Sequence, residues 1–207
     1  MKQERTISAY KNYFMDFISS LRKEEARKIY YILDMLKVQE RVSSKFVKYL
    51  REELYEIRAE YGGNIFRVFF IFDDGNIVIL FNGFQKKTQK TPPSEIEKAL
   101  KIKEEYYEAR NENLTSIDAI MDAEFGKPGT PEREEFRKEA YAYCMGQIIC
   151  DARKKEKMTQ SELAEKIGTN KSYISRIEKG IVDPGISTFC RIIDALGLKI
   201  EIVKPVL

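Results

Sequence analysis

The stretch from Thr159 to Gly180 constrains this chain more than any other, because it encodes two short helices joined at a glycine. Thr159 precedes the first helix and Glu162 follows three positions later, which is the spacing of a capping box. Gly168 permits a tight turn, and Thr169 is expected to cap the second helix. Apolar residues recur at helical spacing, so each helix buries one face. They are Leu163, Ile167, Ile174 and Ile177, with the small Ala164 where the helices cross. The polar first turn of the second helix is left facing solvent.

These residues resemble the Cro/C1-type (XRE-type) helix-turn-helix from about Met145 to Leu198, and the Glu-Lys-Gly-x-x-x-Pro sequence at 178–184 strengthens the match. The resemblance implies an all-α domain whose second helix enters the major groove of operator DNA. It implies DNA contacts from Gln160, Asn170, Lys171, Ser172 and Arg176, with Gln160 on a phosphate. It also implies a homodimer that reads an inverted repeat. Arg153 and Glu178 match a pair that forms a structural salt bridge, so both are left out of the DNA site.

At 207 residues the chain is longer than such a domain requires, so another domain is expected before it. The 36 basic and 33 acidic residues give a net charge of only +3, so any contact with nucleic acid must come from local patches. Three cysteines cannot all pair, and histidine is absent, which predicts reduced thiols and no metal site. No apolar segment approaches the roughly 18 residues that span a bilayer, and no secretory leader is evident. A cytoplasmic protein without a cofactor is expected.

The first half of the chain predicts an α+β fold. Apolar spacing over residues 10–38 indicates one or two helices, and a strand is expected at 54–59. Two β-type runs at 65–72 and 77–81 flank an Asp-Asp-Gly-Asn turn, which is a hairpin signal. A helix over about 95–112, capped by Ser94, follows two prolines. Together these elements predict a small, three-stranded antiparallel sheet covered by helices.

The helical pattern is interrupted at Asn111-Glu112-Asn113, which is the expected domain junction. A short helix is expected at 116–125, and a second one opens with Thr130 as cap and Pro131 in its first turn. Residues 118–139 contain seven acids and four bases. We therefore expect a domain at 1–112, an acidic connector at 113–139 and the helix-turn-helix domain at 140–207. That last domain is expected to close with a helix at 187–196 and an extended tail at 199–203.

Three segments of the first half are similar to the RelE/HigB superfamily of bacterial toxins, in its phage-derived branch, over about residues 8–110. They are Glu56-Ile57-Arg58, Phe66-Arg67 and the run Gly83-Phe84-Gln85-Lys86-Lys87-Thr88-Gln89-Lys90-Thr91-Pro92. The resemblance implies a ribosome-dependent mRNA endoribonuclease that uses no metal. Arg58, Arg67 and Lys86 or Lys87 would hold the phosphate and its transition state, since fixed cations stabilise that developing charge.

A HigA-type antitoxin, which carries this kind of helix-turn-helix, usually accompanies such a toxin. The resemblance therefore implies a type II toxin–antitoxin protein in one chain, either as a natural fusion or as two cistrons joined. The acidic connector would cover the basic RNA-binding face of the toxin, because opposite potentials favour docking. The C-terminal domain would repress its own operon.

Other interpretations stay open. Asn82 stands where many relatives have a histidine, so a general acid would have to be Lys, Arg or Tyr, whose ordinary pKa values lie well above 7. Arg67 can instead form a structural ion pair with Glu56. The lysine run can be an ordinary solvated loop, and the connector can be a solvated linker. The chain would then be a transcriptional regulator whose N-terminal domain serves dimerisation or sensing. Alternatively, the toxin fold is retained only to bind its partner.

Overall fold

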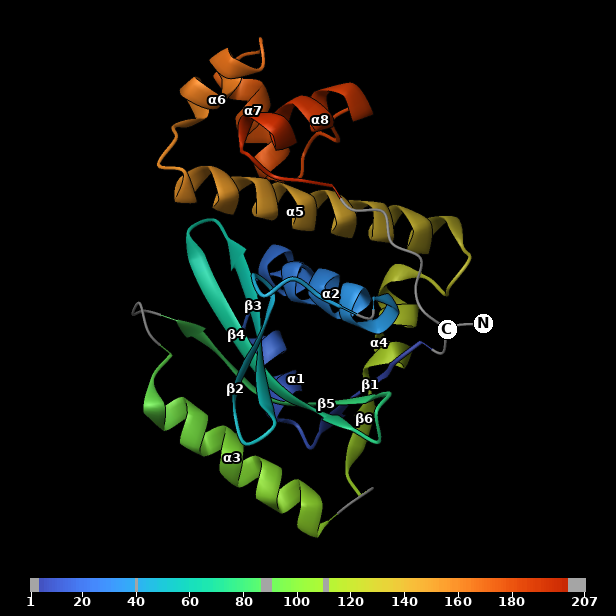
Figure 1. The fold of residues 1–207 in the computed structure, drawn as a ribbon. Helices are drawn as coiled ribbons and strands as arrows, with labels where there is room; N and C mark the ends of the chain where they lie inside the picture. Colours follow the sequence, from blue (N-terminus) through green and yellow to red (C-terminus); the bar gives the residue numbers. More distant parts are fainter. Residues whose placement is uncertain (1–3, 40, 87–90, 110–111, 201–207) are drawn as a thin grey trace. The chain divides into compact units, whose positions relative to one another are not determined.

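The computed structural model describes residues 4–39, 41–86, 91–109 and 112–200 (Figure 1). The chain divides into two compact units, residues 1–140 and 141–207, and each is described by itself. The first unit combines a sheet with helices, and the second is helical. The expected α+β class, with a sheet-containing domain followed by an all-α one, is therefore confirmed.

The sheet of the first unit has six strands in the order β2-β3-β4-β5-β1-β6. They are β1 (Thr6–Tyr10), β2 (Val47–Arg51), β3 (Leu54–Tyr61), β4 (Asn64–Asp73), β5 (Ile77–Lys86) and β6 (Leu114–Ser116). β1 runs parallel to β5, and the other neighbours pair antiparallel. The expected three-stranded sheet was too small. Its missing strands are short, and β2 turns into β3 through Glu52 and Glu53, which adopt positive φ without the glycine that signals such a turn.

The hairpin expected around Asp74 and Gly75 is confirmed. Both residues have positive φ, 45° and 73°, a region that aspartate and glycine tolerate well. Pairing extends from Asp73 opposite Ile77 to Ile65 opposite Lys86, with one register shift between Val68 and Phe70. β4 and β5 are therefore longer than their apolar runs, because backbone pairing continues through the polar residues.

Helices cover both faces of this sheet (Figure 1). α1 (Tyr13–Ser19) and α2 (Lys23–Val38), expected from the apolar spacing, lie on one face, where the ring of Phe17 occupies the space left by Gly83. α3 (Pro93–Glu108) lies on the other face and begins at Pro93, so Ser94 lies inside its first turn and does not cap it. The core on the α3 side joins Ala99, Leu100, Ile102 and Tyr106 to Leu54, Phe69, Ile71, Ile79 and Phe81.

The acidic connector belongs to the first unit, where it packs against β1 and α2. β6 pairs with β1, and α4 (Ile117–Phe125) follows with the Ser116 hydroxyl accepting from the backbone N–H of Ala119 at 3.2 Å. α5 (Pro131–Lys155) begins after Thr130, whose hydroxyl accepts from the N–H of Arg133 at 3.3 Å. Both expected helix starts are therefore present. α5 continues across the boundary between the two units.

Aromatic rings join the connector to α2. The ring of Phe125 stacks on Phe136 with centroids 4.1 Å apart. Tyr30 contacts Phe125 and Tyr31 contacts Phe136, at 5.4 Å and 5.1 Å between centroids. These four rings are buried in the core of the first unit, so the connector contributes to its packing at least as far as Phe136.

The second unit contains the end of α5 and three further helices, α6 (Gln160–Lys166), α7 (Lys171–Glu178) and α8 (Ile186–Ala195). Thr159 and Glu162 form the expected capping box, and Gly168 has a φ of 67°. Their buried side chains form one core: Ile149, Leu163, Ala164, Ile167, Ile174, Ile177, Ile192 and Leu196. The predicted helix pair and its apolar faces are therefore confirmed.

Candidate functional sites

Helix α7 presents a polar surface from its first turn, with Lys171 and Ser172, to its last turn, with Arg176. Lys171, Ser172 and Arg176 are exposed, while Ile174 and Ile177 on the opposite side are buried in the core. Since i and i+4 lie on one face of a helix, Ser172 and Arg176 project together. The expected placement of these three side chains toward solvent agrees with the structure, and their contact with DNA stays a prediction.

Asn170 has a structural role as well as an exposed position. It is the N-cap of α7, and its Oδ1 accepts a hydrogen bond from the N–H of Tyr173 at 2.9 Å. The expectation that Thr169 caps this helix was wrong by one residue. Asn is as good an N-cap residue as Thr, and the exact first residue of a helix is difficult to predict from the sequence.

Gln160, the expected phosphate ligand, makes an internal contact. Its Nε2 donates to Glu178 Oε2 at 2.8 Å, and Arg153 binds the same carboxylate through Nε at 2.6 Å and Nη2 at 3.0 Å. The predicted salt bridge between Arg153 and Glu178 is thus confirmed. Burial alone would raise the pKa of Glu178, but the hydrogen bonds from Arg153 and Gln160 outweigh burial and lower it. The Gln160 amide is therefore held in place at the start of α6.

The candidate catalytic residues of the first unit surround a buried carboxylate. Arg58 and Arg67 are directly opposite each other on β3 and β4. Their Nε atoms lie 3.6 Å and 3.7 Å from the two oxygens of Glu56, and the Thr91 hydroxyl donates to Glu56 at 3.0 Å. Arg67 is 2% exposed, whereas Arg58 is one-third exposed. The ion pair of Arg67 with Glu56, one of the open interpretations, is present in the structure.

Lys86 ends β5 on the same face of the sheet. Its partner across the strands is Ile65, two residues before Arg67, so their side chains share a face. Burial and the neighbouring charge of Arg67 lower the pKa of the Lys86 ammonium. The structure thus brings Arg58, Arg67 and Lys86 together, while Lys87 lies outside the described residues. Asn82 is buried and donates to Glu95 at 3.3 Å.

The connector does not cover this cluster in the described part of the chain. Three of its ion pairs reach α2, where Asp118 binds Lys37 at 3.0 Å, Arg133 binds Asp34 at 3.3 Å and Glu139 binds Arg27 at 2.7 Å, and its backbone and Asp118 also bind β1. α2 lies across the sheet from the α3 side, to which Arg58, Arg67 and Lys86 point. The expected docking of the connector over the basic candidate residues was therefore wrong. Net charge identifies a complementary surface only when the positions of the charges are known.

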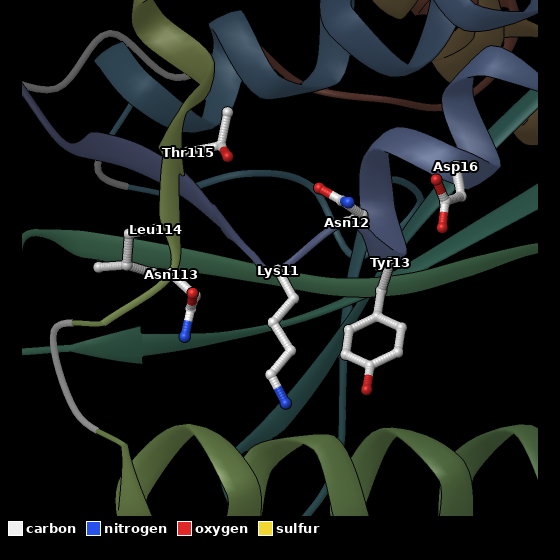
Figure 2. Close-up of a pocket in the computed structure, with 7 residues that line it drawn as sticks. All are labelled: Lys11, Asn12, Tyr13, Asp16, Asn113, Leu114 and Thr115. Atoms are coloured by element: carbon white, nitrogen blue, oxygen red, sulfur yellow. The ribbon is translucent and has the colours of Figure 1, made fainter.

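A hollow of about 550 Å³ lies elsewhere, where the chain passes from β1 to α1. In Figure 2, Lys11 and Tyr13 point toward α3, where Lys11 Nζ binds Glu105 at 2.8 Å. Lys11 and Asn113 both adopt positive φ, and the Lys11 N–H donates to the Asn113 carbonyl at 2.8 Å. The other lining residues are Asn12, Asp16, Leu114 and Thr115. Sequence reasoning missed this hollow, since its walls come from segments about 100 residues apart.

The cysteines and acids add no further site. Cys144 is buried, Cys150 and Cys190 are half-buried, and no disulfide joins any two of these three cysteines. Over the described ranges, no three His, Cys, Asp or Glu side chains gather in a way that would hold a metal ion. None of the helices in the part of the chain that the structure describes is long and apolar enough to cross a membrane.

The capped helix pair and the exposed face of α7 define the second unit as a helix-turn-helix domain. Comparison with known families agrees, since residues 151–203 match the family described as Helix-turn-helix and residues 16–104 match the family described as Phage derived protein Gp49-like (DUF891). The chain therefore belongs to the helix-turn-helix family through its C-terminal unit, and it carries a phage-derived Gp49-like domain before it.

Two curated relatives come from Bacillus phage phi105. The immunity repressor protein is 37% identical over 59 residues, which cover 28% of this chain and 41% of the repressor. The ImmF control region 10 kDa protein is 33% identical over 60 residues, which cover 29% of this chain and 67% of that protein. This chain thus spans less than half of the repressor's length.

One solved structure that resembles this chain is the restriction-modification controller protein C.AhdI from Aeromonas hydrophila. The match is 23% identical in sequence, with a TM-score of 0.29, and covers 30% of this chain and 88% of the controller.

Proposed function

We propose that this protein is a DNA-binding transcriptional regulator that represses its own operon by reading an inverted repeat as a homodimer. The observation that carries the proposal is the surface of α7, where Lys171, Ser172 and Arg176 are exposed on a helix whose other side is buried. In helix-turn-helix proteins the N-terminal turn of this helix contacts base edges. The phage relatives named as a repressor and a control-region protein support the same function. Such a regulator would act in the cytoplasm.

Arginine and lysine suit this task because they donate to the O6 and N7 atoms of guanine, and a good base contact contributes about 1 to 3 kcal/mol of discrimination. Gln160 would add a contact to the DNA backbone. Its Nε2 has a second hydrogen besides the one that it donates to Glu178, so the amide can bind Glu178 and a phosphate together. A dimer of this kind reads half-sites about one helical turn apart.

The test is binding of the full chain to DNA from the region upstream of its own coding sequence, compared with random DNA of equal length. We expect Lys171→Ala and Arg176→Ala each to weaken binding to the upstream DNA by about 1 to 3 kcal/mol and to reduce its preference over random DNA. Lys98→Ala removes an equal charge from an exposed position on α3 and serves as control. Equal affinity of the parent chain for both DNAs would contradict the proposal.

The cluster around Glu56 favours a second function, metal-independent cleavage of mRNA on the ribosome by the N-terminal unit. Arg58 and Lys86 reach solvent on one face of the sheet. Attack by a 2′-hydroxyl increases negative charge on the phosphate, and fixed cations stabilise that charge. The buried Arg67 would hold Glu56 in place and make the electrostatic potential at the bound phosphate more positive. Lys87 remains a candidate phosphate ligand beside Lys86. The lowered pKa of Lys86 makes it a better proton donor to the leaving oxygen than an ordinary lysine.

Combined, these functions describe a type II toxin–antitoxin protein in one chain, in which the connector restrains the toxin through α2. Growth after induction of residues 1–112, residues 1–140 and the full chain tests this. We expect arrest by the shortest product alone, provided that it accumulates as a folded protein, and loss of that arrest in Lys86→Ala. Absence of arrest from a folded fragment would support the rival function, a regulator whose N-terminal domain serves dimerisation, sensing or partner binding without catalysis.

A further inference from the structure

A group of side chains on α2 converges on one oxygen of the connector. Glu139 Oε2 accepts hydrogen bonds from Arg27 Nε at 3.1 Å and from Arg27 Nη2 at 2.7 Å. The same oxygen accepts a hydrogen bond from the Tyr31 hydroxyl. Lys28 Nζ lies 4.4 Å from the centroid of the Tyr31 ring. We name Arg27, Lys28 and Tyr31 the α2 anion site, because a guanidinium fork and a phenol that share one charged oxygen, beside a second cation, also suit a phosphate oxygen.

The groups of this site keep the charge states that anion binding requires. Burial by itself would raise the pKa of Glu139, but the hydrogen bonds from Tyr31 and Arg27 outweigh burial and lower it. Burial raises the pKa of Tyr31 to about 12, so its hydroxyl stays protonated and donates at neutral pH. The side chains of Glu139 and Arg27 are 40% and 34% exposed. Tyr31 is only 2% exposed, so an anion from solution can reach the contact and compete with the carboxylate from the side of Arg27.

The α2 anion site lies at the end of the sheet that also carries Lys86. Lys28 Nζ lies over the ring of Tyr61, the last residue of β3, at 5.6 Å from its centroid. Lys86 ends β5 opposite Ile65, at the start of β4. Between β3 and β4 the chain turns through Gly62 and Gly63, where an added side chain would meet only open space. A polyanion can thus pass from Lys86 around this glycine turn to Lys28 and Arg27. A series of cations that follows the phosphate backbone is a common feature of surfaces that bind single-stranded nucleic acid.

We propose that the α2 anion site binds a phosphate group of single-stranded RNA, and that Glu139 occupies this site in the intact chain. The inference rests on the proposed RNA-directed function of the N-terminal unit. Glu139 comes from the connector, outside residues 16–104 that match the Gp49-like family. The carboxylate acts as an internal competitor of RNA, and its tether keeps its effective concentration high.

The test uses the full chain with Lys171→Ala and Arg176→Ala, which removes the proposed DNA contacts, and a fluorescein-labelled single-stranded RNA oligonucleotide. Glu139→Gln is compared with Glu135→Gln, a matched change at a carboxylate that is 64% exposed on the same helix and paired with Lys138. We expect Glu139→Gln to bind the RNA about tenfold more tightly than Glu135→Gln, the change expected for one charge-assisted contact. Adding Arg27→Ala to the Glu139→Gln chain should remove that gain.

Salt dependence gives a second measurement. A further phosphate contact should steepen the dependence of log affinity on log salt concentration by about 0.7 in the Glu139→Gln chain. Circular dichroism shows whether Glu139→Gln folds. If it does not fold, Glu139→Asp is compared with Glu135→Asp. The shorter side chain of aspartate withdraws the carboxylate from Arg27, so Glu139→Asp should give a smaller gain in RNA affinity. Equal RNA affinities of the two matched variants would overturn the proposal and leave Glu139 as a structural partner of Arg27.

Failure of this inference and failure of the proposed catalysis give different results. If Glu139→Gln tightens RNA binding but no variant cleaves ribosome-bound mRNA, the α2 anion site stands and the ribonuclease function fails. If cleavage occurs and depends on Lys86, while the Glu139 and Glu135 variants bind RNA equally, the ribonuclease function stands and the α2 anion site fails.

Discussion

Arg153 of α5 and Glu178 of α7 form a buried ion pair in which two guanidinium nitrogens meet the two carboxylate oxygens at 2.6 Å and 3.0 Å. The pair joins the long helix to the last residue of the helix that carries the proposed DNA contacts. Arg153 Nη1 also donates to the carbonyl of Met158 at 2.5 Å, just before α6. One arginine therefore ties three segments of the second unit together.

Replacing Glu178 by Ala should destabilise the second unit strongly. The change leaves a buried guanidinium without its counter-charge, a loss that typically costs about 3 to 5 kcal/mol. The loss in free energy of unfolding is measured by chemical denaturation of the full chain, monitored with a signal that comes from the second unit. The control is Lys155→Ala, which removes one partner of the solvent-exposed pair with Asp151 and should cost less than about 1 kcal/mol. Similar losses from both changes would contradict the assigned role of the buried pair.

Asn170 allows capping to be separated from DNA contact. Asn170→Ala should lower the stability of the second unit by about 1 kcal/mol, because the N–H of Tyr173 loses its acceptor. Asn170→Asp retains an acceptor oxygen and should keep the stability, but its negative charge should weaken binding to the upstream DNA. Thermal unfolding and DNA affinity measured on the same samples test both effects. Unchanged DNA affinity in Asn170→Asp would place residue 170 away from the DNA.

Gly146 is required for close packing of α5 against the end of α7. A Cβ at this position would lie 2.3 Å from the carbonyl oxygen of Ile177 and 2.8 Å from that of Glu178. Alanine is normally favoured over glycine within a helix by about 1 kcal/mol. Here the clash with backbone should dominate, so Gly146→Ala should lower the melting temperature by about 4 °C or more. Met145→Ala, at a partly exposed neighbouring position, should change it little. A stabilised Gly146→Ala protein would disprove this packing.

Glu25 should make the stability of the first unit depend on acid pH. Its hydrogen bonds with Arg22 and Asn64 lower its pKa from 4.5 to about 2. A lowered pKa in the folded state contributes stability that is complete above pH 4.5 and is lost as the pH falls through about 2. Urea unfolding should therefore show that Glu25→Gln is less stable than the parent at pH 7, and that the difference shrinks below pH 4.5. The control is Glu24→Gln, an equal change at an exposed neighbouring position, which should alter the free energy of unfolding at pH 7 by less than about 0.5 kcal/mol.

Local signals in the sequence were sufficient for several elements. The Thr159–Glu162 capping box, the Asp-Gly hairpin and the helix starts at Ser116 and Thr130 are present as expected. Each depends on residues within a few positions of one another, where hydrogen-bond geometry and turn preference act directly. Weaker signals failed, since Pro93 rather than Ser94 opens α3, and Asn170 rather than Thr169 caps α7.

The candidate sites were predicted less completely, because side chains meet across strands or between distant segments. The sequence drew attention to Arg58, Arg67 and Lys86, but only the strand register shows that they share a face. It gave no signal for Arg27 and Tyr31, since their partner Glu139 lies more than 100 residues away. Arg27 and Tyr31 are four residues apart, which is ordinary for a helix. Only their shared contact with Glu139 shows that they can bind an anion together.

The sequence by itself determined the helix-turn-helix and the central hairpin, because periodicity, capping and turn chemistry are local properties of a chain. Only the tertiary structure decided that β1 joins β5 in parallel, that β6 completes the sheet, and that the connector binds α2 rather than the face with Arg67. Buried Asp34 and Arg133, 99 residues apart, illustrate the reason. The pairing of two charges depends on which surfaces the fold removes from water together, and that is a property of the whole chain.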